Sequence, residues 1–325
     1  MARKEWTLEE LVAGVRAADR RALARAISLV EDGDPLAYPL VRELYRETGR
    51  AAVVGVTGPP GVGKSSLIGA LVGHIRELDR TVGIVSVDPS SPFSRGALLG
   101  DRIRLSDHFL DPGVYIRSMG TRGHLGGLAE ATLQAVLLLD AAGKQVVFVE
   151  TVGAGQSEVE VTGIADTVLL VLMPGSGDAV QALKAGIMEI PDVIAINKME
   201  HPAAKTMLNE VRSIVALSEP EQRPPILLTE ALTGESVPEL WSALDAHREA
   251  LEQDGRLEER RRKNLASEVF AIASSRAKAH LEEAVAGDPR LRDLLAQVER
   301  RQLDPLSAVR QIMEEVFRLD GADDR

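Results

Sequence analysis

Residues 58–65 constrain this chain more than any other part of its sequence. They read Gly-Pro-Pro-Gly-Val-Gly-Lys-Ser, which fits the pattern G-x-x-x-x-G-K-[ST]. A valine-rich run at 51–57 precedes them, and an amphipathic helical pattern follows. This strand–loop–helix order predicts a loop whose backbone N–H groups surround the phosphates of a nucleoside triphosphate. A chance match in a glycine-rich turn is the alternative, and both flanks argue against it.

Each residue of this loop has an expected role. We expect Lys64 to reach the β- and γ-phosphates and the Ser65 hydroxyl to bind Mg²⁺. The full set predicted to contact the nucleotide here is Gly58, Pro59, Pro60, Gly61, Val62, Gly63, Lys64, Ser65 and Ser66.

Short apolar runs alternate with helical patterns through the middle of the chain. Continuous Val/Ile/Leu runs of this kind are typical of parallel strands covered on both faces. We therefore predict an α/β fold with a doubly wound, mostly parallel sheet, whose ligands bind at the carboxyl ends of the strands. The expected domains are a helical segment at 1–50, a P-loop domain at 51–253 and a helical extension at 254–325. The expected strands are 51–57, 81–88, 114–118, 145–150, 167–173, 192–197 and 225–229.

The two flanking segments carry helix signals. Thr7 and Glu10 have the spacing of a capping box, and Asp34-Pro35 predicts the start of a later helix. Residues 255–263 are strongly charged, which favours a solvated helix face over a binding patch.

Composition excludes several classes of protein. A net charge of −11 and 3% aromatic residues disfavour nucleic-acid binding. The absence of cysteine excludes disulfides and thiolate metal sites. No apolar run approaches 18 residues, and the first residues resemble no leader, so we expect a cytoplasmic protein without a membrane partner.

Acidic residues follow two of the expected strands. Asp88 ends the second run and Asp101 lies further along the same loop, where either carboxylate suits Mg²⁺, although Asp101 would equally suit a helix cap. Glu150 ends the fourth run, and Gly153 follows at the spacing of a switch that detects the γ-phosphate. Gln156 is a candidate for orienting the attacking water, or an ordinary loop glutamine.

The sixth and seventh runs end in residues suited to reading a base. Asn197, Lys198 and Glu200 match Asn-Lys-x-Asp apart from one extra methylene, and the carboxylate would pair with guanine N1–H and N2–H₂. Thr229 and Ala231 occupy the second base loop, where backbone N–H groups would meet guanine O6. These residues favour GTP over ATP.

Five strings of the sequence are longer than a general nucleotide motif requires: residues 58–65, VDPSSPFS at 87–94, GALLGDRIR at 96–104, ETVGAGQSE at 150–158 and PGSGD at 174–178. In these strings the chain resembles the MeaB/ArgK-type G-protein chaperones of adenosylcobalamin-dependent acyl-CoA mutases, which are SIMIBI-class P-loop GTPases. The resemblance covers nearly the whole chain. Two departures are Glu200, where the family usually has Asp, and Arg95, where it usually has Gly.

The resemblance implies a GTP- and Mg²⁺-dependent homodimer that docks on methylmalonyl-CoA mutase or a relative. Such proteins gate cofactor loading and protect or reactivate the mutase. By the family pattern Asp88, Asp101 and Glu150 surround the metal, and the C-terminal extension is the expected dimerisation region. A third switch at 174–184 would couple the nucleotide to the mutase. Lys184 would end that switch and reach the partner's active site, unless it is a solvated helix lysine.

Three other functions remain open from the sequence. A nickel-insertion GTPase would carry Cys/His clusters, but the chain has no cysteine and six scattered histidines. A small-molecule kinase or transport-coupled ATPase would need an acceptor pocket and an aimed base, which the sequence does not reveal. A nucleotide-binding scaffold without hydrolysis is the third. The candidate catalytic residues are Lys64, Glu150, Gln156 and Lys184.

Overall fold

A computed structural model of the chain describes residues 5–88, 105–120, 127–151, 163–175, 191–220 and 223–317. For Asp88, Ser106 and residues 127–129 it describes the backbone alone. The chain divides into two compact units, Met1–Val269 and Phe270–Arg325. Four predicted site residues lie outside the described residues: Asp101, Gly153, Gln156 and Lys184.

The first unit is built on a parallel sheet of seven described strands in the order β3-β2-β4-β1-β5-β6-β7. The predicted α/β class is confirmed, and each expected strand is present to within two residues at either end. The carboxyl ends of β1 and its neighbours β4 and β5 lie where the chain changes direction across the sheet, which is where ligands bind in such folds. The strands are β1 Ala52–Thr57, β2 Val82–Asp88, β3 Val114–Gly120, β4 Val146–Thr151, β5 Thr167–Leu172, β6 Val193–Asn197 and β7 Ile226–Thr229.

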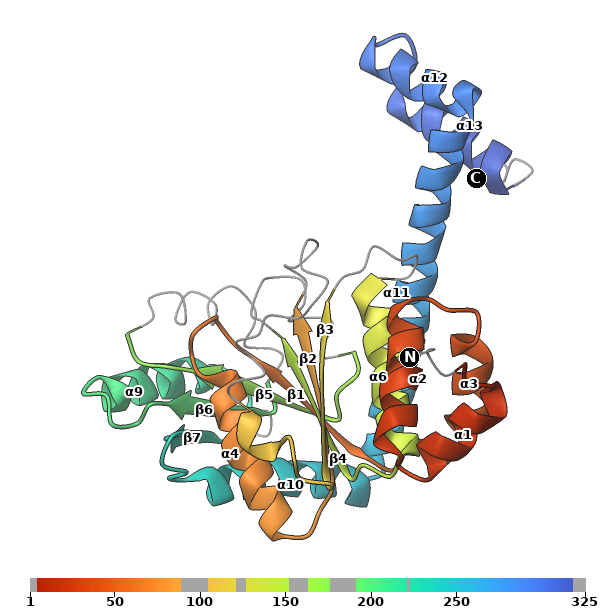
Figure 1. Cartoon of the computed structure of the whole chain (residues 1–325). Coiled ribbons are helices and arrows are strands. Elements are labelled where there is room, and N and C mark those ends of the chain that lie inside the picture. Colours follow the sequence, from red (N-terminus) through yellow and green to blue (C-terminus); the bar gives the residue numbers. More distant parts are fainter. Residues whose placement is uncertain are drawn as a thin grey trace. The chain divides into compact units, whose positions relative to one another are not determined.

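Helices cover both faces of the sheet (Figure 1). On one face α4 (Lys64–Glu77) and α10 (Val237–Gln253) bury alternate strand residues such as Val56 and Phe148. On the other face α6 (Gly127–Ala141) and α9 (Ala204–Val215) cover the strand residues that alternate with these, such as Val149 and Ile196. The strands are buried on both sides, which explains why they read as continuous apolar runs.

Three helices precede the sheet and add to its α6 face: α1 (Leu8–Arg16), α2 (Arg20–Glu31) and α3 (Ala37–Leu44), with a 3₁₀ turn at Tyr45–Glu47. The capping box predicted at Thr7 and Glu10 is present, with both hydrogen bonds at 3.2 Å. The third helix begins at Ala37, later than predicted, but the Asp34 side chain accepts from the Leu36 N–H at 2.9 Å, as a helix-capping residue does.

The last three helices are α11 (Arg256–Gly287), α12 (Pro289–Glu299) and α13 (Pro305–Phe317). The first turns of α11 belong to the first unit, and the remainder belongs to the second. In the second unit Leu291 and Ala308 are buried, whereas Phe270, Leu306 and Val309 are 73%, 81% and 57% exposed. Among the described residues, no helix has both the length and the apolar character needed to cross a bilayer.

Candidate nucleotide site

The loop between β1 and α4 has a backbone that two of its glycines make possible. Gly58 and Gly63 adopt φ angles of 139° and 96°. A Cβ on Gly58 would lie 2.1 Å from the carbonyl oxygen of Val171, and one on Gly63 would lie 2.5 Å from the Asn197 side-chain nitrogen. Glycine is therefore required at both positions, since both have positive φ angles and the loop packs directly against β5 and the end of β6.

Lys64 opens α4 and is 6% exposed. Its ammonium donates to the carbonyl oxygens of Gly58 at 2.6 Å and Pro59 at 3.0 Å. The cation therefore lies within the curve of the loop, held by the loop's own backbone. A buried cation of this kind is suited to pairing with an anion that the loop's N–H groups also contact.

Glu150 is the centre of a buried cluster of oxygen atoms. It is 6% exposed, and its Oε1 accepts from the Ser65 hydroxyl at 2.6 Å while its Oε2 accepts from the Ser86 hydroxyl at 3.1 Å. The strand register places Ser86 beside Glu150. We did not single out Ser86 from the sequence, although it lies two residues before Asp88 and must share its face of β2.

This cluster provides the donor set expected for Mg²⁺. Ser65 and Glu150 contribute hard oxygen atoms, which Mg²⁺ prefers together with several waters. Asp88 ends β2 next to them, with only its backbone described. No group of three or more His, Cys, Asp or Glu side chains gathers within the part of the chain that the structure describes. The described donors fit a magnesium ion held by few protein ligands.

Asn197 joins the loop to the predicted base-reading segments. It is 2% exposed, its Nδ2 donates to the carbonyl oxygen of Val62 at 2.9 Å, and its Oδ1 accepts from the Ala231 N–H at 3.1 Å. Three segments that are far apart in sequence are thus fixed together by one amide. The motif predicted Asn197 as a base-site residue, and the structure adds this bridging contact.

The residues after Asn197 turn toward the surface. Lys198 has a φ of 61° and donates to the Met173 sulfur at 3.2 Å, whereas Glu200 is exposed. Thr229 ends β7 fully buried. The Ala231 N–H, which we expected to face a base oxygen, is engaged by Asn197.

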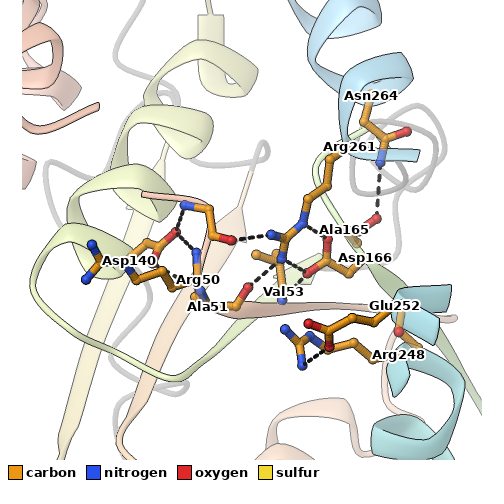
Figure 2. A network of polar contacts seen from close by, with 12 residues as sticks. Arg50, Ala51, Val53, Asp140, Ala165, Asp166, Arg248, Glu252, Arg261 and Asn264 are labelled. Atoms are coloured by element: carbon orange, nitrogen blue, oxygen red, sulfur yellow. Dashed lines mark hydrogen bonds and ion pairs between the residues drawn. The ribbon is translucent and has the colours of Figure 1, made fainter. Parts of the chain in front are cut away.

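Most of the charged stretch that begins α11 is exposed, as its sequence favoured, but two of its arginines contact the sheet. Arg261 makes a bidentate pair with Asp166, with both contacts at 2.6 Å, and donates to the carbonyl oxygen of Ala51 at 2.7 Å (Figure 2). Arg260 pairs in the same way with Asp192 at 3.0 and 2.7 Å. These two arginines therefore attach α11 to the amino-terminal ends of the strands, opposite the phosphate loop.

Comparison with known proteins identifies the family. A model described as "Methylmalonyl Co-A mutase-associated GTPase MeaB" matches residues 23–286, which include every strand of the sheet. The chain belongs to this family. The resemblance of the sequence to MeaB/ArgK-type proteins is thereby confirmed, and the site above is that of a MeaB-family P-loop protein.

Individual relatives agree with this assignment. A putative GTPase of Pyrococcus abyssi is 44% identical over 315 residues, covering 95% of this chain and 97% of the relative. GTPase ArgK of Escherichia coli is 33% identical over 320 residues, covering 95% and 97%. A crystal structure described as a LAO/AO transport system kinase superposes with a TM-score of 0.74 at 27% identity, covering 98% of this chain and all of that one.

Proposed function

We propose that this MeaB-family chain hydrolyses GTP and acts as a chaperone of an adenosylcobalamin-dependent acyl-CoA mutase, methylmalonyl-CoA mutase or a relative. The observation that carries the nucleotide part is that Lys64, Glu150 and Asn197 each form a hydrogen bond with residues of the phosphate loop. The family description, a GTPase associated with methylmalonyl-CoA mutase, supports the partner.

The phosphate end of the site follows from the loop. In the proposed complex the Lys64 ammonium exchanges its loop carbonyl contacts for β- and γ-phosphate oxygens, because a phosphate anion is the stronger partner for a buried cation. The backbone N–H groups of residues 58–66 and the amino terminus of α4 surround the same oxygens. The predicted reporter of the γ-phosphate is Gly153.

Glu150 and Ser65 supply the metal end. Ser65 would bind Mg²⁺ through its hydroxyl, which now donates to Glu150, and Glu150, Asp88 and Asp101 would hold the metal through its waters. The metal would neutralise charge that develops on the β- and γ-phosphates. Ser86 keeps the Glu150 carboxylate oriented by donating to its second oxygen. Gln156 is the proposed water-orienting residue and Lys184 the residue that reaches the partner.

The base end is proposed to select guanine. Glu200 is exposed three residues after Asn197 and would pair with guanine N1–H and N2–H₂. Lys198 and the Thr229–Ala231 segment would flank the ring. Asn197 fixes these segments to the phosphate loop, so a base held between them is placed at a constant distance from the triphosphate.

We further propose that the active form is a homodimer. The exposed apolar side chains of the C-terminal unit, Phe270, Leu306 and Val309, support this proposal, since the two buried apolar residues of that unit give it little core of its own. Size-exclusion chromatography of the purified protein tests this proposal. Wild type should elute as a dimer, and a Phe270→Ser/Leu306→Ser variant should elute as a monomer.

Hydrolysis is tested by single-turnover phosphate release. Wild type should release phosphate from GTP and not from ATP, and Lys64→Ala should lower the rate at least about a hundredfold, because the lysine stabilises transition-state charge. Tight GTP binding without release would instead indicate a nucleotide-binding scaffold.

The partner is tested by a pull-down from native extract on the immobilised protein loaded with a non-hydrolysable GTP analogue. A cobalamin-dependent mutase should be recovered, and the same protein without nucleotide is the control. A kinase is the second candidate, because a structural relative is described as a transport system kinase. GTP turnover that rises with a small acceptor and stays constant with the mutase would favour it.

A further inference from the structure

Two threonine hydroxyls beneath the phosphate loop have no partner among the described residues. Thr57 is the last residue of β1 and Thr151 is the last residue of β4, and each is 1% exposed. Neither Oγ1 has a hydrogen-bond partner within the described parts of the chain. Buried hydroxyls are nearly always paired, so two of them at one place need an explanation.

The strand register places these hydroxyls together. Val56 lies beside Glu150, so Thr57 and Thr151 follow as neighbours at the ends of adjacent parallel strands. Side chains alternate along a strand, so both threonines point to the α6 face, the side on which Val53 and Val149 are buried. Glu150 and Ser65 meet on the opposite face. The pair therefore lies behind the acidic cluster, between the strand that leads into the phosphate loop and the strand that carries Glu150.

Leaving such groups unpaired raises the free energy of the state that contains them. A water molecule suits the position, because each hydroxyl can both donate and accept and a buried water needs two or more polar partners.

We propose that Thr57 and Thr151 are positioning residues of the nucleotide site, which together hold one buried water molecule. The water would tie the end of β1 to the end of β4 and so fix the phosphate loop relative to Glu150. This inference rests on the proposed GTP hydrolysis, since it assigns the pair a role in that same site.

Valine replaces threonine with nearly the same shape and no hydroxyl. We therefore compare Thr57→Val, Thr151→Val and the double variant with wild type in thermal unfolding, alone and with GDP or a non-hydrolysable GTP analogue, and in single-turnover GTP hydrolysis. Thr151→Ser keeps the hydroxyl and tests rescue. Thr167→Val is the matched control, because Thr167 is also 1% exposed in this sheet but its hydroxyl pairs with His247 at 2.9 Å, at the opposite edge.

The free Val variants should melt lower than wild type, because each change leaves the shared water and the remaining hydroxyl short of a partner. The rise in Tm caused by the GTP analogue should shrink, and hydrolysis should fall about tenfold in either single variant. The double variant should fall no further, since both hydroxyls hold one water. Thr151→Ser should restore the rate, and Thr167→Val should lower the Tm without changing the response to nucleotide.

Two results would overturn the inference while leaving the proposed function intact. One is that both Val variants hydrolyse GTP at the wild-type rate and show the same rise in Tm with the GTP analogue as wild type. The other is a double variant whose hydrolysis falls well below that of either single variant, which would mean that the two hydroxyls do not share one water. Wild-type protein that neither binds nor hydrolyses GTP would overturn the proposed function itself, and the inference with it.

Discussion

Replacing Arg261 by alanine should destabilise the first unit strongly, because this side chain neutralises a carboxylate that water barely reaches. Asp166 is 2% exposed and receives two contacts of 2.6 Å from the guanidinium. Its remaining described partner is the Val53 N–H at 2.9 Å, at the start of β1. The variant therefore leaves a buried charge with one hydrogen bond, and it also frees the carbonyl oxygen of Ala51.

The magnitude follows from that uncompensated charge. Removing one partner of a buried ion pair costs roughly 3–5 kcal/mol. The Arg261 side chain is 23% exposed, so water can enter the space it leaves, and the lower end of that range, about 3 kcal/mol, applies. The hydrogen bonds that Arg261 donates to Asp166 raise the pKa of Arg261, and burial opposes this shift without cancelling it, so the pair is charged.

Urea unfolding followed by tryptophan fluorescence measures the effect. Both tryptophans of the chain, Trp6 and Trp241, belong to the first unit, so the signal reports that unit. Arg262→Ala is the matched control, because Arg262 is the exposed neighbour on the same helix and should change the free energy of unfolding by less than about 0.5 kcal/mol. Equal stability of the two variants would refute the reasoning.

Three further predictions concern the site and the acid stability of the fold. Asn197→Ala should lower the free energy of unfolding by about 2 kcal/mol in urea titration and weaken GTP binding in calorimetry, because it breaks two buried contacts between the loops; unchanged affinity would contradict the bridging role. Gly58→Ala should abolish nucleotide binding and lower the Tm, because its Cβ meets a carbonyl oxygen of β5; a variant that binds GTP normally would show that the loop can shift. Burial tends to raise the pKa of Asp192, but hydrogen bonds from His247 and Arg260 outweigh it and hold that pKa below its usual value. This carboxyl stabilises the fold above about pH 4, and its contribution is lost as pH falls through the lower folded value. Asp192→Asn should therefore flatten the acid limb of a plot of Tm against pH, and an unchanged limb would count against the assignment.

The sheet could be predicted closely because its strands are buried on both faces. Their apolar runs are continuous, and Pro, Gly and charged residues mark their ends. The loop at 58–65 could be predicted for a similar reason, since its positive φ angles admit little besides glycine. Here local chemistry alone determines the local structure.

Contacts between segments far apart in the sequence could not be predicted in the same way. The stretch around Arg260 and Arg261 has the composition of a solvated helix, and only the tertiary fold brings it to Asp192 and Asp166. Asp34 makes the hydrogen bond expected of a cap, but the regular part of α3 starts only at Ala37, a difference of a few residues that sequence signals do not resolve. Ser86 was not predicted as a site residue, although it lies two residues before Asp88. Its pairing with Glu150 depends on which strands are neighbours in the sheet.

The rate of single-turnover GTP hydrolysis, measured with and without saturating adenosylcobalamin-dependent mutase, tests the central claim most directly. Intrinsic hydrolysis should be slow, because the charges described at the site, chiefly Lys64, leave transition-state stabilisation incomplete, and the mutase should accelerate it at least about tenfold. The Lys64→Ala variant should show neither intrinsic GTP hydrolysis nor hydrolysis stimulated by the mutase. A rate that the mutase leaves unchanged, with binding confirmed in the same sample, would contradict the account.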